Sequence, residues 1–168
     1  MERIRKERLS QSNSLKQKDK VIAIYESTES DDSNDLPTTW QFVFLEKLTS
    51  SLNYGTSSKS LASGKIPVLR MGNMQKGEID WSSLAYTSDD KDIEKYKLEP
   101  YTVLFNRTNS PELVGKTSIY RGEKEAIFAG YLIRINHLPQ LDPEYLNYFL
   151  NSPYAQSICW QCKTDGVS

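Results

Sequence analysis

Histidine and cysteine are scarce in this 168-residue chain, which holds one histidine and two cysteines. The single histidine, His137, excludes a multi-histidine metal site and leaves one candidate base for a Ser–His or Cys–His pair. Neither G-x-G-x-x-G nor G-x-x-x-x-G-K-[ST] occurs, so no dinucleotide or nucleoside triphosphate is indicated. We therefore predict a protein with no catalytic residues, no metal and no cofactor of its own.

Three weaker signs of chemistry have simpler interpretations. Cys159 and Cys162 form a C-x-x-C pair, but zinc needs a second pair of ligands, so we interpret them as small apolar side chains on one face of a helix. His137 follows a predicted strand and is typical of a surface loop. Asp89-Asp90-Lys91 has the D-x-K spacing of some nucleases. Without an upstream Pro-Asp, it indicates the solvated start of a helix.

Long apolar runs are also missing. No stretch approaches the ~20 apolar residues that a membrane span requires, and the basic, polar N-terminus lacks a signal-peptide pattern. The sequence thus predicts a cytoplasmic protein with no membrane contact.

Charge is balanced overall but unevenly distributed. Residues 1–20 carry seven bases and three acids, residues 21–40 carry five acids and no base, and the remaining 128 residues carry 14 of each sign. The net charge of −1 therefore neither excludes nor supports a basic face for nucleic acid on the folded part.

Short strands with interspersed helices are expected along the chain. The predicted strands are Trp40–Leu45, Ile66–Met71, Tyr101–Phe105, Val114–Tyr120 and Ala126–Ile135, with Ile79–Tyr86 either a strand or a turn. The predicted helices are Met1–Lys20, Glu46–Leu52, Asp89–Tyr96 with Ser88 as N-cap, Pro143–Leu150 with Asp142 as N-cap, and one starting near Pro153. Asn53–Gly64 and Asn106–Glu112 are expected loops.

This pattern predicts an α+β fold with a small, twisted, mainly antiparallel sheet and flanking helices. The expected organisation is the end of a charged spacer helix over residues 1–20, an acidic linker over 21–35 and one globular domain over 36–168. The helix has too few apolar residues to form a core alone.

Three loops carry the candidate binding residues, because binding groups concentrate in loops on a rigid scaffold. Arg can bind guanine and Asn adenine through paired hydrogen bonds, while Ser, Thr and Lys suit phosphates. The candidates are Tyr54, Thr56, Ser57, Lys59, Arg70, Asn73, Asn106, Arg107, Thr108, Asn109 and Lys116. The same residue types dominate ordinary turns, and strand arginines such as Arg70 and Arg134 pair equally well with carboxylates.

An ordered set of motifs is similar to the target-recognition domain of type I restriction-modification specificity subunits. The matching segments are Leu36–Trp40 (LPTTW), Tyr54–Ser57 (YGTS), Ile66–Asn73 (IPVLRMGN), Val103–Ser110 (VLFNRTNS), Glu112–Thr117 (ELVGKT), Phe128–Arg134 (FAGYLIR), Pro143–Leu146 (PEYL) and Leu150–Pro153 (LNSP). No single segment is specific, but their order over Leu36 to Pro153 is. The segment Glu2–Lys20 resembles the tail of the long helix that precedes a second recognition domain in such subunits.

The resemblance implies a role. Such a domain reads one half of a bipartite double-stranded DNA target, while partner modification subunits methylate adenine with S-adenosylmethionine and a restriction (motor endonuclease) subunit cleaves with ATP and magnesium. A full subunit has two recognition domains and two long helices, whereas this chain has one domain and a helix stub. If the chain is a natural half-subunit, a homodimer is an expected assembly.

Two alternatives stay open. The chain could be the recognition region of a single-chain restriction-methyltransferase, whose catalytic part would lie outside this sequence. It could also be a protein-interaction module of the same fold that uses the loops to bind another protein.

Overall fold

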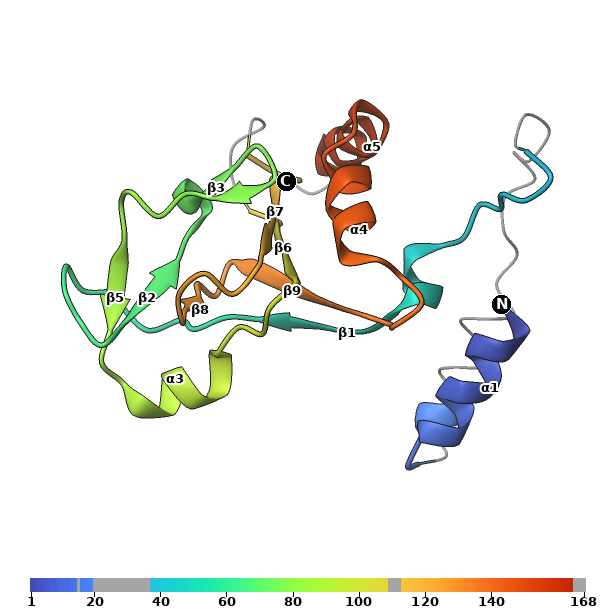
Figure 1. Cartoon of the computed structure of the whole chain (residues 1–168), viewed down its shortest axis with the longest axis horizontal. Helices are drawn as coiled ribbons and strands as arrows, with labels where there is room; N and C mark the ends of the chain where they lie inside the picture. Colours follow the sequence, from blue (N-terminus) through green and yellow to red (C-terminus); the bar gives the residue numbers. More distant parts are fainter. Residues whose placement is uncertain (15, 20–36, 109–112, 165–168) are drawn as a thin grey trace. The chain divides into compact units, whose positions relative to one another are not determined.

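The structure is a computed structural model that describes residues 1–14, 16–19, 37–108 and 113–164 (Figure 1). The chain divides into two units, Met1–Thr49 and Ser50–Ser168, which are described separately below. The predicted acidic linker over residues 21–35 lies outside the described residues. Among the described residues, no helix is both long enough and apolar enough to cross a membrane.

The first unit contains α1 (Glu2–Gln11) and the 3-10 helix η2 (Leu45–Leu48). Of α1, only Ile4 is buried, which agrees with the prediction of a charged helix that cannot form a core alone. The Arg8 guanidinium donates a hydrogen bond to the Glu46 carbonyl at 3.3 Å. The helix is shorter than the predicted Met1–Lys20, because Ser12 takes an extended backbone conformation and ends it.

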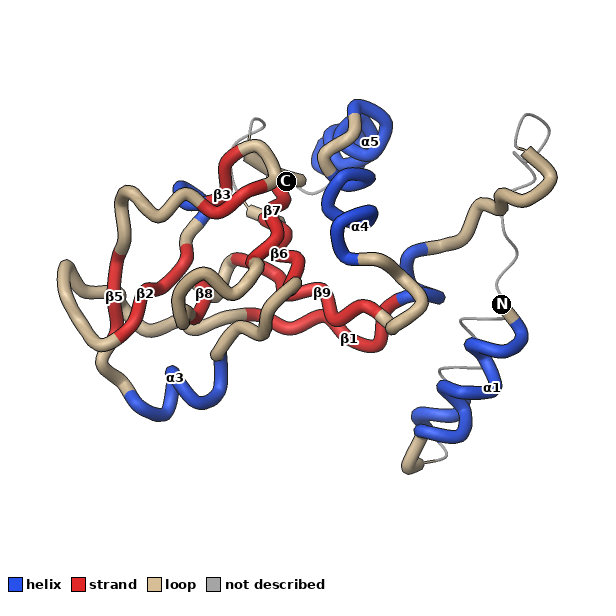
Figure 2. The backbone as a smooth tube through the Cα atoms, viewed as in Figure 1, coloured by secondary structure: helices blue, strands red, loops and turns tan. Residues whose placement is uncertain are grey.

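Strands make up most of the second unit, and Figure 2 shows them in red. They are β1 (Thr49–Tyr54), which begins at the unit boundary, β2 (Ile66–Leu69), β3 (Met74–Gln75), β4 (Glu78–Ile79), β5 (Ala85–Thr87), β6 (Thr102–Asn106), β7 (Thr117–Tyr120), β8 (Ile127–Phe128) and β9 (Leu132–His137). A 3-10 helix, η3 (Met71–Asn73), follows β2.

These strands form three small sheets with orders β1-β9-β6-β7, β5-β2-β8 and β3-β4. The pairings of β6 with β7 and β9, of β2 with β5 and of β3 with β4 are antiparallel, whereas β2 and β8 pair in parallel. The predicted α+β fold with mainly antiparallel pairing is therefore confirmed.

Three helices belong to this unit: α3 (Asp90–Tyr96), α4 (Pro143–Leu150) and α5 (Pro153–Thr164). The prediction for α4 is confirmed in full, since the Asp142 carboxylate accepts hydrogen bonds from the backbone N–H groups of Glu144 and Tyr145. The predicted cap of α3 is wrong by one residue. Asp89, not Ser88, accepts the helical N–H groups, because its carboxylate is a charged acceptor at the positive end of the helix.

The core lies between the sheets. Its main cluster is apolar and contains Leu69, Met74, Ile79, Leu98, Leu104, Tyr120, Ala126, Phe128 and Leu132. A second cluster joins Val68, Ile127 and Ala129. Strands from all three sheets contribute to the main cluster, so burial of these side chains stabilises the arrangement of the sheets.

Two predictions near the start of the domain are wrong. Trp40–Phe44 forms no strand in the described structure, and its aromatic side chains are exposed. The predicted helix Glu46–Leu52 is the single 3-10 turn η2 followed by β1. Ser50 and Ser51 have low helix propensity, and the strand β1 to which they belong lies next to β9 in its sheet.

The predicted strand Ala126–Ile135 is divided into β8 and β9, which belong to different sheets. The division falls at Gly130, whose N–H donates to the Thr56 carbonyl at 2.7 Å. A Cβ atom on Gly130 would lie 2.9 Å from the same oxygen. The backbone can therefore turn from one sheet into the next only because no side chain is present here.

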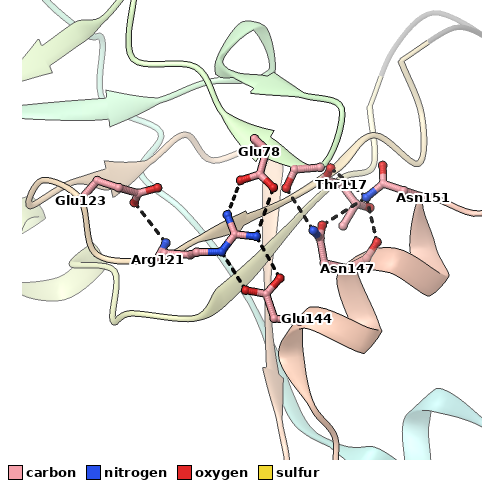
Figure 3. Close-up of polar contacts among 8 residues, drawn as sticks. Glu78, Thr117, Arg121, Glu123, Glu144, Asn147 and Asn151 are labelled. Atoms are coloured by element: carbon pink, nitrogen blue, oxygen red, sulfur yellow. Dashed lines mark hydrogen bonds and ion pairs between the residues drawn. The ribbon is translucent and has the colours of Figure 1, made fainter.

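Arg121 joins the β3–β4 sheet to α4. Its guanidinium forms ion pairs with Glu78 of β4 and with Glu144 of α4, the latter at 2.7 Å (Figure 3). These two carboxylates raise the pKa of Arg121 through their hydrogen bonds. Nearby, the Asn147 side-chain amide donates to the carbonyl of Gly77, in the turn between β3 and β4, at 3.1 Å. Polar contacts at two points therefore hold α4 against β4 and the turn that precedes it.

Candidate nucleic-acid interface

Three of the candidate residues have buried side chains that serve the fold. Asn73 is 2% exposed, and its amide donates to the carbonyls of Asp80 and Ser83 at 3.0 and 2.8 Å. Asn106 is fully buried and donates to the Leu113 carbonyl at 2.7 Å, which closes the loop after β6. These two side chains hold loops in place, because their amide groups are already satisfied within the protein.

Thr56 is the third of these buried candidates. Its hydroxyl is hydrogen-bonded to the Asp92 carboxylate on α3, and its backbone N–H donates to the Phe128 carbonyl at 2.9 Å. The loop that follows β1 is thus attached both to a helix and to β8. This attachment gives the exposed part of the loop a defined position.

Four candidates are exposed: Tyr54, Ser57, Lys59 and Arg107. The structure brings Tyr54 and Arg107 together, although 53 positions of sequence separate them. The carbon at the centre of the Arg107 guanidinium lies 4.8 Å from the centroid of the Tyr54 ring. This cation–π contact orients an exposed arginine, and it joins the end of β1 to the loop after β6.

The other candidates are held at different places. Lys116 donates to the Gln75 side chain at 3.3 Å. Arg70 precedes η3, and its Nε is buried without a hydrogen-bond partner among the described residues. Thr108 lies in the loop closed by Asn106 and donates to the Asn106 side chain, whereas Asn109 is outside the described residues.

An open hollow lies next to Tyr54. It has a volume of about 230 Å³ and is lined by Asn53, Tyr54, Gly55, Lys95, Tyr96 and Arg134. We refer to these six residues as the hollow. The lining includes two cations and two tyrosines but no carboxylate, which is the composition of a site for an anion or a nucleotide.

Three residues of the hollow, Lys95, Tyr96 and Arg134, are not among the binding residues predicted from the sequence. Arg134 and Asn136 occupy alternate positions of β9, so the period-2 pattern of a strand places them on one face. This alternation could have identified Arg134 from the sequence as a polar residue on one face of the strand. For Lys95 and Tyr96 no local signal existed, because only the packing of α3 brings them to the end of β1.

For Arg134 and Arg70, the sequence left two interpretations open, which were an ion pair with a carboxylate and a contact with nucleic acid. Neither forms an ion pair within the part of the chain that the structure describes. By contrast, Arg121 has two carboxylate partners. The structure therefore separates a structural arginine from two whose charge is not neutralised by a described acidic side chain.

The residues proposed as simple structural elements are placed as follows. His137 ends β9 and is half-buried, with its Nδ1 3.1 Å from the Leu138 carbonyl. Cys159 is half-buried on α5. Asp89 caps α3 and Asp90 pairs with Lys65 at 2.6 Å. Among the described residues, no group of His, Cys, Asp or Glu side chains is arranged to hold a metal.

Sequence comparison with known proteins yields one informative relative. Over 123 residues, which is 69% of the chain, it is 32% identical to the specificity subunit of the type I restriction enzyme MjaX from Methanocaldococcus jannaschii. This chain is a partial relative of type I restriction specificity subunits. It spans 28% of the length of that relative. No protein-family model matches the chain.

Solved structures show the same fold. The crystal structure of the HsdS subunit from Thermoanaerobacter tengcongensis matches with a TM-score of 0.55 and 19% identity, over 94% of this chain and 38% of that one. A chain from a study of complex assembly and conformational transition of the type I R-M system matches with a TM-score of 0.56 and 18% identity, with the same coverage. The relation to a specificity subunit agrees with the prediction of a non-catalytic component.

Proposed function

We propose that this chain is a target-recognition module of a type I restriction-modification specificity subunit, which binds one half of a bipartite sequence in double-stranded DNA. The relation to a specificity subunit over 69% of the chain carries this proposal. The exposed pair Tyr54–Arg107 and the cations of the hollow supply the kind of side chains that DNA contacts use. The chain acts in the cytoplasm, together with its partner subunits.

The test is a binding measurement with the intact chain. DNA duplexes that the chain enriches from a randomised pool should share a short common sequence, and binding should weaken steeply with salt because each phosphate contact releases counterions. Arg107→Ala should reduce discrimination between the enriched and a scrambled duplex by about 1–3 kcal/mol. Lys59→Ala is the matched control. This exposed lysine suits a phosphate, so its loss should lower affinity for both duplexes and leave the discrimination between them unchanged. Failure to enrich any sequence would refute the proposal.

Assembly with partner subunits is the second part of the proposal. Aromatic side chains of α4 and α5 are exposed, with Tyr145 56%, Tyr148 72% and Tyr154 58% accessible. Phe149 contacts both Tyr145 and Tyr154, so these three residues form one aromatic surface, and Tyr148 is exposed on the same helix as Tyr145 and Phe149. Surfaces of this kind are typical of protein–protein contacts, and we assign this one to the modification subunit, with the restriction subunit joining the resulting complex.

Co-purification tests this assignment. The wild-type chain should form a complex with modification subunits of the same system, and Tyr148→Ser should weaken it while DNA binding by the isolated chain is unchanged. If Tyr148→Ser lowers DNA binding and leaves the complex intact, the aromatic surface belongs to the DNA interface instead.

A further inference from the structure

The hollow contains Arg134, an arginine whose charge no described carboxylate neutralises. Arg134 lies on β9, and its two terminal nitrogens contact only neutral acceptors, the Lys97 carbonyl at 3.3 Å and the Asn53 side-chain oxygen at 3.5 Å. Its Nε is buried without a hydrogen-bond partner among the described residues. A guanidinium whose terminal nitrogens make only long contacts with neutral acceptors favours binding of an external anion.

Aromatic packing fixes the position of this guanidinium. Its central carbon lies 5.7 Å from the centroid of the Phe128 ring, and Phe128 is fully buried. Tyr96, another residue of the hollow, contacts the same ring edge-on at 6.3 Å. Arg134 is therefore oriented before a ligand arrives, which reduces the loss of side-chain entropy on binding.

A second cation lies at the rim. Lys95 is exposed on α3, and its Nζ is 5.0 Å from the centroid of the Tyr96 ring. The hollow thus presents one oriented guanidinium fork, from Arg134, and one flexible ammonium group, from Lys95. This combination is common in phosphate sites, because the fork sets the geometry and the lysine adds charge.

Base recognition is less compatible with the amides at this site. Adenine recognition by asparagine needs both the oxygen and the nitrogen of the amide. The Asn53 side-chain oxygen already accepts hydrogen bonds from Asn136 and Ser51. The Asn136 nitrogen also donates to the Ser51 hydroxyl at 2.8 Å. These side chains form hydrogen bonds with one another, so they stabilise the hollow and do not recognise a base.

We infer that the hollow is a phosphodiester site, in which Arg134 and Lys95 bind one phosphate of the DNA backbone and position the duplex beside Tyr54 and Arg107. This inference rests on the proposed function and adds a division of roles to it. Arg134 and Lys95 contribute affinity that does not depend on sequence, whereas the Tyr54–Arg107 pair at the edge of the hollow contributes the base contacts.

The experiment compares Arg134→Gln and Lys95→Gln with the wild-type full-length chain on two duplexes, one enriched from a randomised pool and one scrambled. Lys76→Gln is the matched control, because Lys76 is an exposed lysine in the β3–β4 turn and does not line the hollow. Lys95→Gln alters an exposed side chain and keeps the test valid if Arg134→Gln proves poorly folded.

Loss of a phosphate contact should lower affinity for both duplexes by the same factor, about tenfold for Arg134→Gln. It should also reduce the slope of log K against log salt by about 0.9 per contact. The ratio between the two duplexes should stay unchanged. A collapsed ratio with an unchanged slope would show that Arg134 reads a base, and an unchanged affinity in both variants would show that the hollow does not contact DNA.

Methylphosphonate substitution locates the contact. Single phosphates of the enriched duplex are replaced, one at a time, by the uncharged group. At one position the replacement should weaken binding of the wild-type chain but leave binding of Arg134→Gln unchanged. If every position weakens both proteins equally, the inference is wrong even though DNA binding is retained. If the wild-type chain binds no duplex, the proposed function itself has failed, and this outcome is distinct from the others.

Discussion

Buried amides are the residues whose loss should affect this protein most strongly. Asn73 accepts from the Arg70 N–H at 3.0 Å and donates to the carbonyls of Asp80 and Ser83. Asn73→Ala leaves these three partly buried backbone groups without their partner. We expect the free energy of unfolding to fall by about 2 kcal/mol in urea denaturation. Ser57→Ala, at an exposed position, should change it by less than about 0.5 kcal/mol.

Tyr120 should make stability depend on alkaline pH. Burial raises the pKa of its phenol, as do Glu123 and Glu125, and the hydroxyl donates to the Lys124 carbonyl at 2.9 Å. Because the pKa is higher in the folded state, its contribution is fully present below the ordinary value of about 10 and is lost as the pH rises through the folded value. The stability of wild type should fall more steeply above about pH 10 than that of Tyr120→Phe.

The comparison isolates this one group. The pKa of Lys97 is also raised, mainly through its hydrogen bond and ion pair with Glu125 and least by Tyr120. The main contribution has the same sign and is common to both proteins. Parallel stability curves for wild type and Tyr120→Phe in urea denaturation across this pH range would contradict the prediction.

At the scale of elements, the crossing of the loop after β1 with β8 depends on one glycine. A Cβ atom on Gly55 would lie 2.0 Å from the Phe128 carbonyl oxygen and 2.6 Å from that of Ala129. Gly55→Ala should therefore separate the loop from β8 and lower the free energy of unfolding by about 3 kcal/mol.

Gly72→Ala is the control for this prediction. A Cβ atom on Gly72 would have no neighbour within 4 Å, so its effect on thermal unfolding should be small. Equal melting temperatures for the two variants would show that the crossing can be rearranged at little cost.

Sequence patterns were most successful for elements with local stop signals. Asp142 and Pro143 marked the start of α4 correctly, since an N-cap and a first-turn proline act within one helical turn. The apolar run Ala126–Ile135 predicts one strand, because Gly130 is the single interruption in an otherwise apolar stretch. Only the approach of Thr56, from 74 positions earlier in the chain, shows why the run is divided.

At the scale of the whole molecule, the proposed domain over residues 36–168 can be tested by removing what precedes it. We expect a chain that starts at Leu36 to bind the enriched duplex with a dissociation constant within about twofold of the full chain, or ~0.4 kcal/mol. It retains every residue of the hollow and the Tyr54–Arg107 pair. Fluorescence anisotropy with the same labelled duplex provides the measurement.

Association with partner subunits is the second property to measure for this truncated chain. Because residues 1–20 resemble the end of a spacer helix, their removal should weaken association with partner subunits more than it weakens DNA binding. A truncated chain that loses DNA binding but keeps its folded spectrum would place the first unit in the DNA interface and would overturn the proposed division of the chain.

The sequence by itself determined which chemistry is scarce, the α+β class and the order of motifs shared with specificity subunits. These depend on residue identity and on contacts within a few positions of sequence. The tertiary structure decided which polar residues are available. Asn73, Asn106 and Thr56 look like binding residues in a list, yet their side chains satisfy distant backbone and carboxylate groups. Arg134 and Lys95 both line the hollow because α3 packs against β8, where Tyr96 contacts Phe128, and no local pattern encodes an arrangement made across 39 positions of chain.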